Sequence, residues 1–193
     1  MEAAKASPRR EELLEAAYRY VLDHGLGDLS LRPLAAAVGS SPRVLLYLFG
    51  SKDGLVRALL IRARADEREL LRQTPTGDLT EAAGLIWDWL AAPAHRAVLT
   101  LWVEAYARSL IEPDGPWAGF ARDSVREWLA LLASAQPPGD RDTEGGAARR
   151  TAVLAVLRGA LLDLLATGDT ARTTAAVRHQ LAALAGSAPL RRP

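Results

Sequence analysis

The chain contains no cysteine, one methionine and two phenylalanines among its 193 residues. Without cysteine, disulfides, thiolate nucleophiles and cysteine zinc sites are excluded. No run reaches the roughly 18 consecutive apolar residues that a membrane span needs, and no basic-then-apolar segment opens the chain. These absences predict a cytoplasmic protein with no membrane partner.

The chain also lacks a strong charge of either sign, since its formal net charge is +1. A strongly basic composition would indicate an anionic partner, and this composition does not. Any nucleic-acid interpretation must therefore depend on where the charges lie. The hydrophobic share of 49% is that of an ordinary globular protein, and the length suits one large domain or two small ones.

Signals for β-strands are nearly missing, whereas helix signals recur along the chain. A serine followed by proline at Ser7-Pro8 predicts a first helix, which ends near Gly25. Ser30 begins a short second helix. Ser41-Pro42 repeats the serine-proline start and opens a third helix that extends to about Phe49. Ser51 caps a fourth, long helix.

A break at 74–77 separates these helices from five others, the first of which begins at Asp78 with Glu81 three residues on, as in a capping box. The segment 136–146, "QPPGDRDTEGG", has the composition of a mobile loop. The five helices are expected at 78–90, 94–111, 116–135, 147–167 and 170–185.

The predicted fold is therefore all-α, with about nine helices. An N-terminal three-helix domain, 1–55, is joined by a long helix to a C-terminal helical domain, 56–193.

The stretch "AAAVGSSPRVLLYLFGSKDGL" predicts a helix-turn-helix motif. Two short helices, 30–38 and 42–49, flank a tight turn that contains Gly39. In such a motif the second helix enters the major groove of DNA, about 12 Å wide, and the first helix braces it across the backbone. A short second helix with an exposed N-terminal end suits this task. An αα turn that is only part of a hydrophobic core is the alternative.

The residue types in this motif fit contacts with DNA. Serine hydroxyls and helix N-terminal N–H groups bind phosphates without net positive charge. Arg43 lies where it can reach a guanine base or a phosphate. Tyr47, on the same face, can contact a phosphate or the methyl group of thymine. Lys52 lies where it can contact the DNA backbone beside the groove. Lys5, Arg9 and Arg10 are expected to add phosphate contacts. The candidate DNA-binding residues are Ser30, Arg32, Ser41, Pro42, Arg43, Tyr47 and Lys52.

Residues 10–60 resemble the N-terminal domain of the TetR family of transcriptional regulators. The resemblance is carried by "DHGLGDLSLRPLA", "AAAVGSS" and "LLYLFGSKDGL". The family's recognition helix ends in Phe, followed by Ser-Lys-acid and a leucine, and this chain matches at Phe49, Ser51, Lys52, Asp53 and Leu55.

The chain departs from the family pattern in the same helix. Leu46 stands where many members have Tyr, and Leu48 where a polar residue is common. Pro42 and Arg43 also differ from the usual residues of the family. A small residue such as glycine is frequent at the second of these two positions, where this chain has Arg43. The base-reading pattern of the family therefore does not transfer to this chain.

The resemblance implies DNA binding by the N-terminal domain and binding of a small effector by the C-terminal domain. It transfers no ligand residues. Trp102 and Tyr106 share a face of one helix, so they are the candidate ligand-binding residues, with packing in a helical core as the alternative. The surrounding composition predicts a hydrophobic or aromatic effector.

The last two helices carry stripes of apolar residues, and "AVLAVLRGALLDLLATG" is apolar almost all round. Two such helices from each of two subunits would form a four-helix interface. A core formed within one chain is the alternative. The candidate interface residues are Val153, Leu157, Ala160, Leu164 and Leu181.

Other chemistry finds little support. His24, His95 and His179 are far apart and lack the i,i+4 partner of a helical metal site, so no metal is expected. No dinucleotide fingerprint, P-loop or nucleophile elbow occurs, so neither a cofactor nor a catalytic residue is expected. Glu104 and Arg108 fit a helical i,i+4 ion pair.

These observations predict a homodimeric DNA-binding regulator, most simply a repressor that a small ligand releases from a palindromic operator. Two alternatives come from other classes of protein. One is a helical enzyme, which turnover of a substrate would reveal. The other is a protein-interaction adaptor with a vestigial helix-turn-helix, which would bind no DNA.

Overall fold

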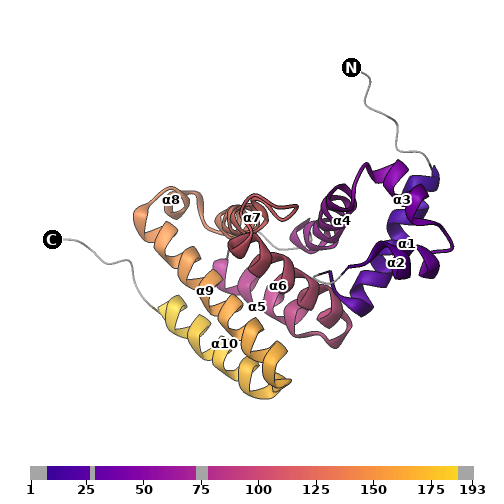
Figure 1. The fold of residues 1–193 in the computed structure, drawn as a ribbon. Helices are drawn as coiled ribbons and strands as arrows, with labels where there is room; N and C mark the ends of the chain where they lie inside the picture. The colour runs from indigo at the N-terminus through magenta and orange to yellow at the C-terminus, as the bar shows by residue number, and fades with distance from the viewer. Residues whose placement is uncertain (1–7, 27–28, 73–77, 187–193) are drawn as a thin grey trace. The chain divides into compact units, whose positions relative to one another are not determined.

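The computed structural model describes residues 8–26, 29–72 and 78–186 (Figure 1). Within these ranges the chain forms ten α-helices, one short 3-10 helix and no strand. This confirms the all-α prediction. In the same part of the chain, no helix is both long enough and apolar enough to cross a bilayer.

The first four helices lie close to where the sequence predicts them. They are α1 (Pro8–His24), α2 (Leu31–Ala37), α3 (Pro42–Phe49) and α4 (Lys52–Arg72). Helix α1 ends at Gly25, whose φ of 78° is the left-handed conformation that glycine tolerates at a helix end. The expected cap Ser7 lies outside the described residues.

The described residues form two compact units. The first comprises those of Met1–Glu67 and Ala97–Ala121, and the second those of Arg68–Arg96 and Arg122–Pro193. The expected boundary between residues 55 and 56 falls inside α4 and within the first unit. The first unit also contains most of α6 (Arg96–Ile111), which follows α4 only after a helix of the second unit.

One hydrophobic core joins the helices of the first unit. Leu13, Ala17 and Val21 lie one turn apart on α1, which is the spacing that gives a helix one apolar face. Helix α6 adds Leu101 and Ala105 to the same core. The core residues from α2, α3 and α4 are Leu34, Ala35, Leu45, Phe49, Leu55, Val56, Ala58, Leu59 and Leu60. This core fixes the inward face of each short helix.

The second unit is built on a helical hairpin. Helices α9 (Glu144–Thr167) and α10 (Thr170–Gly186) run side by side, and both contact α5 (Leu79–Ala91) (Figure 1). The indole of Trp87 is 1% exposed and donates a hydrogen bond of 3.0 Å to the Thr174 hydroxyl, which satisfies the polar atom of a buried ring. The unit also contains η1 (Pro93–His95), α7 (Phe120–Ser134) from Arg122 onward and α8 (Pro138–Arg141).

The structure corrects the expected loop at 136–146. The short helix α8 lies in this segment, and α9 begins at Glu144, because the Thr143 hydroxyl accepts a hydrogen bond of 2.9 Å from the Gly146 N–H. The Arg141 guanidinium donates to the carbonyl of Ala133 at 2.9 Å. Local hydrogen bonds therefore order a segment whose composition is typical of loops.

Two other boundaries differ from the prediction. The helix expected from 116 begins at Phe120, directly after Gly119, whose φ is 75°. The helix expected from 94 begins at Arg96, because η1 occupies the preceding turn. Asp78 caps α5 as predicted, since its carboxylate accepts hydrogen bonds from the Thr80 and Glu81 N–H groups at 2.7 and 3.1 Å.

Candidate DNA-binding site

The turn between α2 and α3 has the form that the sequence predicts. Gly39 has a φ of 63°, a left-handed conformation that a residue with a side chain rarely adopts. The Ser40 N–H donates to the Ala35 carbonyl at 2.8 Å, and the Val38 N–H donates to the Leu34 carbonyl at 3.0 Å. These bonds close the end of α2 and turn the chain toward α3, which packs against it.

Both ends of α3 are specified by local chemistry. The Ser41 hydroxyl accepts a hydrogen bond of 3.3 Å from the Val44 N–H, and Pro42 occupies the first turn, where its missing N–H costs nothing. Gly50 ends the helix with a φ of 79° while its N–H donates to the Leu46 carbonyl at 2.8 Å. The helix is short because a cap and a glycine enclose it.

Helix α3 presents one face to the core and the opposite face to solvent. Leu45 is 1% exposed and Phe49 is 8% exposed, so this pair holds the helix on the core. Successive residues rotate by about 100° around a helix, which places Arg43 and Tyr47 on the far side. Arg43 is exposed, and the Tyr47 side chain is 87% exposed. An exposed aromatic residue next to an arginine is a surface suited to a groove of DNA.

The remaining predicted contacts lie at helix starts or on the surface of the same unit. Ser30 stands at the N-cap of α2, with no hydrogen bond from its side chain to the helix, and is exposed. Arg32 on α2 is exposed, and so is Lys52, the first residue of α4. The Ser51 hydroxyl accepts from the Gly54 N–H at 3.0 Å and so caps α4 as expected.

Gly54 allows α4 to begin close to the end of α3. A Cβ atom added at Gly54 would lie 2.1 Å from the Phe49 carbonyl oxygen, far inside van der Waals contact. The chain therefore needs a residue without a side chain at this point. The sequence shows the glycine but gives no sign of the carbonyl that requires it.

Arg10 has a role that sequence reasoning missed. Its guanidinium lies 4.9 Å from the centroid of the Phe49 ring and donates to the Leu48 carbonyl at 3.4 Å. Arg10 thus attaches α1 to the C-terminal end of α3, where a cation is favoured. Arg9, its neighbour, forms an ion pair of 3.2 Å with Glu12. Lys5, expected to act with them, lies outside the described residues.

Glu104 on α6 also has a partner that was not predicted. Its carboxylate accepts a hydrogen bond of 2.9 Å from the Leu26 N–H, in the segment that follows α1. The ion pair expected between Glu104 and Arg108 is wrong, because Arg108 instead pairs with Glu112 at 2.8 Å. A sequence pattern cannot show this choice, since both carboxylates are one helical turn from Arg108.

The two candidate ligand residues lie together on α6. Trp102 and Tyr106 are half-buried, with ring centroids 5.0 Å apart and planes inclined at 35°. Both pack against the hydrophobic core of the first unit. Three other tryptophans are 1–6% exposed and belong to the protein interior: Trp87, Trp117 and Trp128.

The candidate interface residues on α9 and α10 are mostly covered within their own chain. Val153, Leu157, Leu164 and Leu181 are 1–6% exposed, and Ala160 is half-buried. A second copy could cover almost none of the surface of the first four. They pack inside the second unit, and the exposed surface of these helices is their other face.

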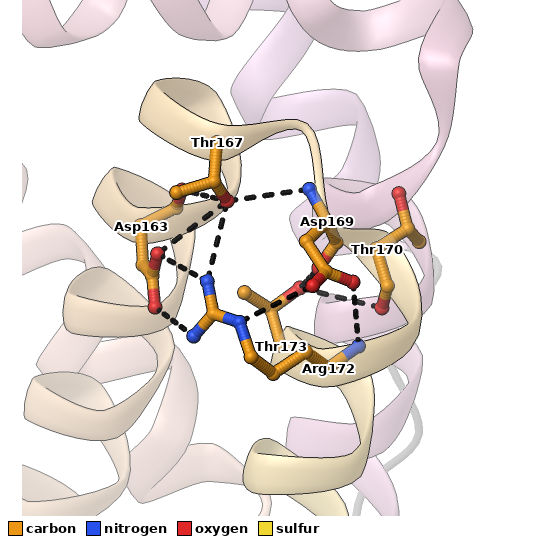
Figure 2. A network of polar contacts seen from close by, with 6 residues as sticks. All are labelled: Asp163, Thr167, Asp169, Thr170, Arg172 and Thr173. Atoms are coloured by element: carbon orange, nitrogen blue, oxygen red, sulfur yellow. Dashed lines mark hydrogen bonds and ion pairs between the residues drawn. The ribbon is translucent and has the colours of Figure 1, made fainter.

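A polar network closes the turn between α9 and α10 (Figure 2). The Arg172 guanidinium makes two hydrogen bonds of 2.7 Å to the Asp163 carboxylate and a third of 3.3 Å to Asp169. The hydrogen bonds that Arg172 donates, aided by its charge, lower the pKa of Asp163, and the same hydrogen bonds, with the negative charge of Asp163, raise the pKa of Arg172. The fork of the guanidinium thus links α9 to the first turn of α10 through two parallel hydrogen bonds.

The first three helices and the start of α4 together form a helix-turn-helix DNA-binding fold. Residues 13–59 match the model of the family described as "Bacterial regulatory proteins, tetR family". The match covers the first three helices and the start of α4, so this part of the chain is a domain of that family.

A relative by sequence is the HTH-type transcriptional regulator BetI from Brucella suis biovar 1 (strain 1330). It is 30% identical over 132 residues, which are 68% of this chain and 56% of that protein. The matched residues thus span just over half the length of the BetI proteins, 57% of the one from Brucella anthropi.

Among solved structures, the multidrug binding protein EbrR complexed with imidazole is 27% identical, with a TM-score of 0.70 over 92% of this chain and 90% of that one. A transcriptional regulator from Rhodococcus sp. Rha1 has a TM-score of 0.76 at 19% identity, over 90% of this chain and 94% of that one. The similarity to the Rhodococcus regulator, at 19% identity, concerns the fold alone.

Proposed function

We propose that this protein is a DNA-binding transcriptional regulator, a homodimeric repressor that a small ligand releases from a palindromic operator. The observation that carries the proposal is the outward face of α3, where exposed Arg43 and Tyr47 lie on a short helix capped at both ends. The same residues fall within the segment that matches the family model. The proposal assigns the chain no catalytic reaction and places it in the cytoplasm, where bacterial DNA lies.

In this proposal residues 1–55 bind DNA and residues 56–193 bind the effector and form the dimer. Arg43 and Tyr47 enter the major groove, while Ser41 and Pro42 bring the N-terminal end of α3 to a phosphate. Exposed groups to either side then hold the backbone and set the register: Ser30, Arg32 and Lys52.

The proposed dimer forms through the outward faces of α9 and α10. Leu162 on α9 is 52% exposed, and it lies one turn from exposed Gly159 and two turns from exposed Ala155. On α10 the exposed residues at the same spacing include Ala171, Ala175, Ala182 and Ala185. Small side chains allow two helical hairpins to approach closely, and the network around Arg172 holds each hairpin in shape.

The proposed effector is hydrophobic or aromatic and binds against Trp102 and Tyr106. The half-buried rings of these residues offer an aromatic surface. EbrR, the 27% identical multidrug binding protein, has been solved with proflavin, a planar aromatic molecule. The ligand would act by a population shift, favouring a spacing of the two recognition helices that does not fit successive major grooves.

Selection of bound DNA from a random pool, followed by footprinting of the selected sequence, tests the central proposal. We expect a palindromic sequence with half-sites one helical turn apart or a multiple of it. Lack of enrichment for any DNA sequence would rule out the proposed function.

Titration with proflavin tests the effector proposal. We expect a change in tryptophan emission that Trp102→Phe reduces and Trp128→Phe, at a buried position, does not. Once the binding of proflavin to the DNA itself is subtracted, proflavin should release the selected DNA and bind the protein more weakly when operator is present, because the coupling of two binding sites is reciprocal. Equal binding with and without operator would show that proflavin is not an effector.

A further inference from the structure

The recognition helix α3 has an unusual composition for a surface that meets DNA. Its eight residues, all of them described, are "PRVLLYLF". The helix therefore contains no Asn, Gln, Asp, Glu, Ser, Thr or Lys. The side chains that pair with adenine through two hydrogen bonds, or accept from cytosine, are among these missing types. Only the Arg43 guanidinium and the Tyr47 hydroxyl remain for polar contacts.

The outward face of α3 is instead apolar on both sides of its centre. Val44 is 39% exposed, Leu46 is 40% exposed and Tyr47 is 87% exposed. These are three of the eight large hydrophobic side chains that are exposed in the described part of the chain, and all three lie within four consecutive residues. Such a concentration on one short helix indicates a binding surface.

The positions of these residues around α3 determine which side chains lie at the centre of its outward face and which lie on its two sides. With Leu45 directed into the core, a rotation of about 100° per residue places Arg43 and Tyr47 on the outermost line of α3. Val44 and Leu46 fall on opposite sides of this line. The surface therefore has an arginine and an aromatic ring in the middle and an aliphatic side chain on each flank.

We propose that Val44, Leu46 and the ring of Tyr47 read the C5-methyl groups of thymine in the major groove, with Arg43 on a single guanine. This inference rests on the proposed function. Of the four standard bases, thymine alone presents a methyl group in the major groove, so it is the base that aliphatic side chains distinguish. Arg43 has the geometry to bind guanine O6 and N7, the commonest specific contact of arginine.

The operator half-site then has a definite composition. It contains one G·C pair beside A·T pairs whose thymine methyls face α3, and it is read with few hydrogen bonds. Burial of one methyl group contributes about a fourfold change in affinity, at about 0.8 kcal/mol per buried carbon group.

The test uses the selected operator with single atoms changed. Deoxyuridine in place of a thymine removes only the methyl group, and we expect it to lower affinity about fourfold at each contacted position. Replacing T·A by 5-methylcytosine·G keeps the methyl group in the major groove but changes the hydrogen-bonding groups of the base pair. We expect this operator to bind more tightly than one with unmethylated C·G at that position.

Variants of the protein assign each methyl to a side chain. Leu46→Ala and Val44→Ala should each abolish the difference between thymine and deoxyuridine at one position and leave it unchanged at the others. Ile61→Ala, at a position on α4 that is 66% exposed, is the matched control and should preserve every difference. All three positions are exposed, so these variants should keep the stability of the unchanged protein, as thermal unfolding would verify.

The outcomes separate this inference from the proposed function. Tight sequence-specific binding with no thymine in the half-site, or with no response to deoxyuridine, would overturn methyl reading and leave DNA binding standing. Enrichment of no DNA at all would overturn both. If deoxyuridine lowers the affinity of Val44→Ala and Leu46→Ala as much as that of the unchanged protein at every thymine, the assignment of the methyl groups to these side chains is also contradicted.

Discussion

The carboxylate of Glu104 on α6 accepts a hydrogen bond of 2.9 Å from the backbone N–H of Leu26, just after α1. Leu26 is 1% exposed, so its N–H has little access to water as a replacement partner. Little more than one turn of α6 therefore carries both the acceptor of this hydrogen bond and the candidate effector residues Trp102 and Tyr106. A ligand that shifts these rings would act on the same helix that holds the end of α1.

Removal of the Glu104 carboxylate should destabilise the first unit. We expect Glu104→Ala to lower the free energy of unfolding by about 1–3 kcal/mol, because it leaves a buried N–H without its acceptor. Glu104→Gln keeps an acceptor and should cost less. Urea unfolding measures both changes. Equal stability of Glu104→Ala and the unchanged protein would show that the hydrogen bond contributes nothing.

Lys52 and Arg10 are both cations near α3, but we expect them to respond differently to salt. Lys52→Ala removes a phosphate contact, so it should weaken binding to all DNA sequences and lower the slope of affinity against salt by about 1. Arg10→Ala removes a cation that contacts Leu48 and Phe49, so it should reduce thermal stability and leave the salt slope unchanged. A lower slope for Arg10→Ala would place Arg10 on the DNA backbone instead.

A side chain at Gly54 should disturb the junction of α3 and α4. In Gly54→Ala the new Cβ meets the Phe49 carbonyl oxygen, which is backbone and cannot rotate away. We expect a loss of about 1–3 kcal/mol of stability, as overpacking usually costs. Gly84→Ala in α5, where an added Cβ meets no atom within 4 Å, is the control and should be neutral or stabilising. Equal effects in thermal unfolding would contradict the close approach.

The two faces of α9 should respond differently to a charge. Leu162→Arg places the charge on the proposed dimer surface, and we expect folded monomers in sedimentation experiments. Leu157→Arg places it in the interior, where Leu157 is 1% exposed, and should unfold the chain. Leu110→Arg, at a position that is 66% exposed on α6, is the control and should remain dimeric. Dimers of Leu162→Arg would exclude this face as the interface.

The network around Asp163 should make stability depend on pH in the acidic range. Because Arg172 lowers the pKa of Asp163 in the folded state, the stabilisation is fully present above the unfolded pKa, about 3.9, and is lost as pH falls through the folded value. We expect Arg172→Gln to lower the melting temperature at pH 7 and to return the pKa of Asp163 toward its ordinary value.

Arg126→Gln, which removes an exposed ion pair of 2.9 Å with Asp123, is the control for this network. Nuclear magnetic resonance titration of the Asp163 carboxyl measures the pKa directly. A carboxyl that titrates alike in Arg172→Gln and in the unchanged protein would contradict the network.

The sequence by itself determined the helices and the motif. A serine cap, a proline in the first turn and a glycine at the helix end act on neighbouring residues, so the limits of α3 could be predicted without tertiary contacts. The inward position of Leu45 and Phe49 follows from helical periodicity once a core exists. The exposure of Val44 and Leu46 does not follow from residue type, because aliphatic side chains are usually found in the interior.

Only the tertiary structure decided which side chains meet across the chain. The spacing of Glu104 and Arg108 allows an ion pair, but packing places the Glu104 carboxylate at the N–H of Leu26, which lies 78 residues earlier in the sequence. The charge of Arg10 is compatible with a phosphate contact, but in the folded chain its guanidinium lies over the ring of Phe49. The apolar residues on α9 also depend on packing, because this helix contacts α5 and α10, and Leu157 is buried whereas Leu162 is exposed. Periodicity identifies an apolar face, whereas the partner that covers it is set by long-range contacts.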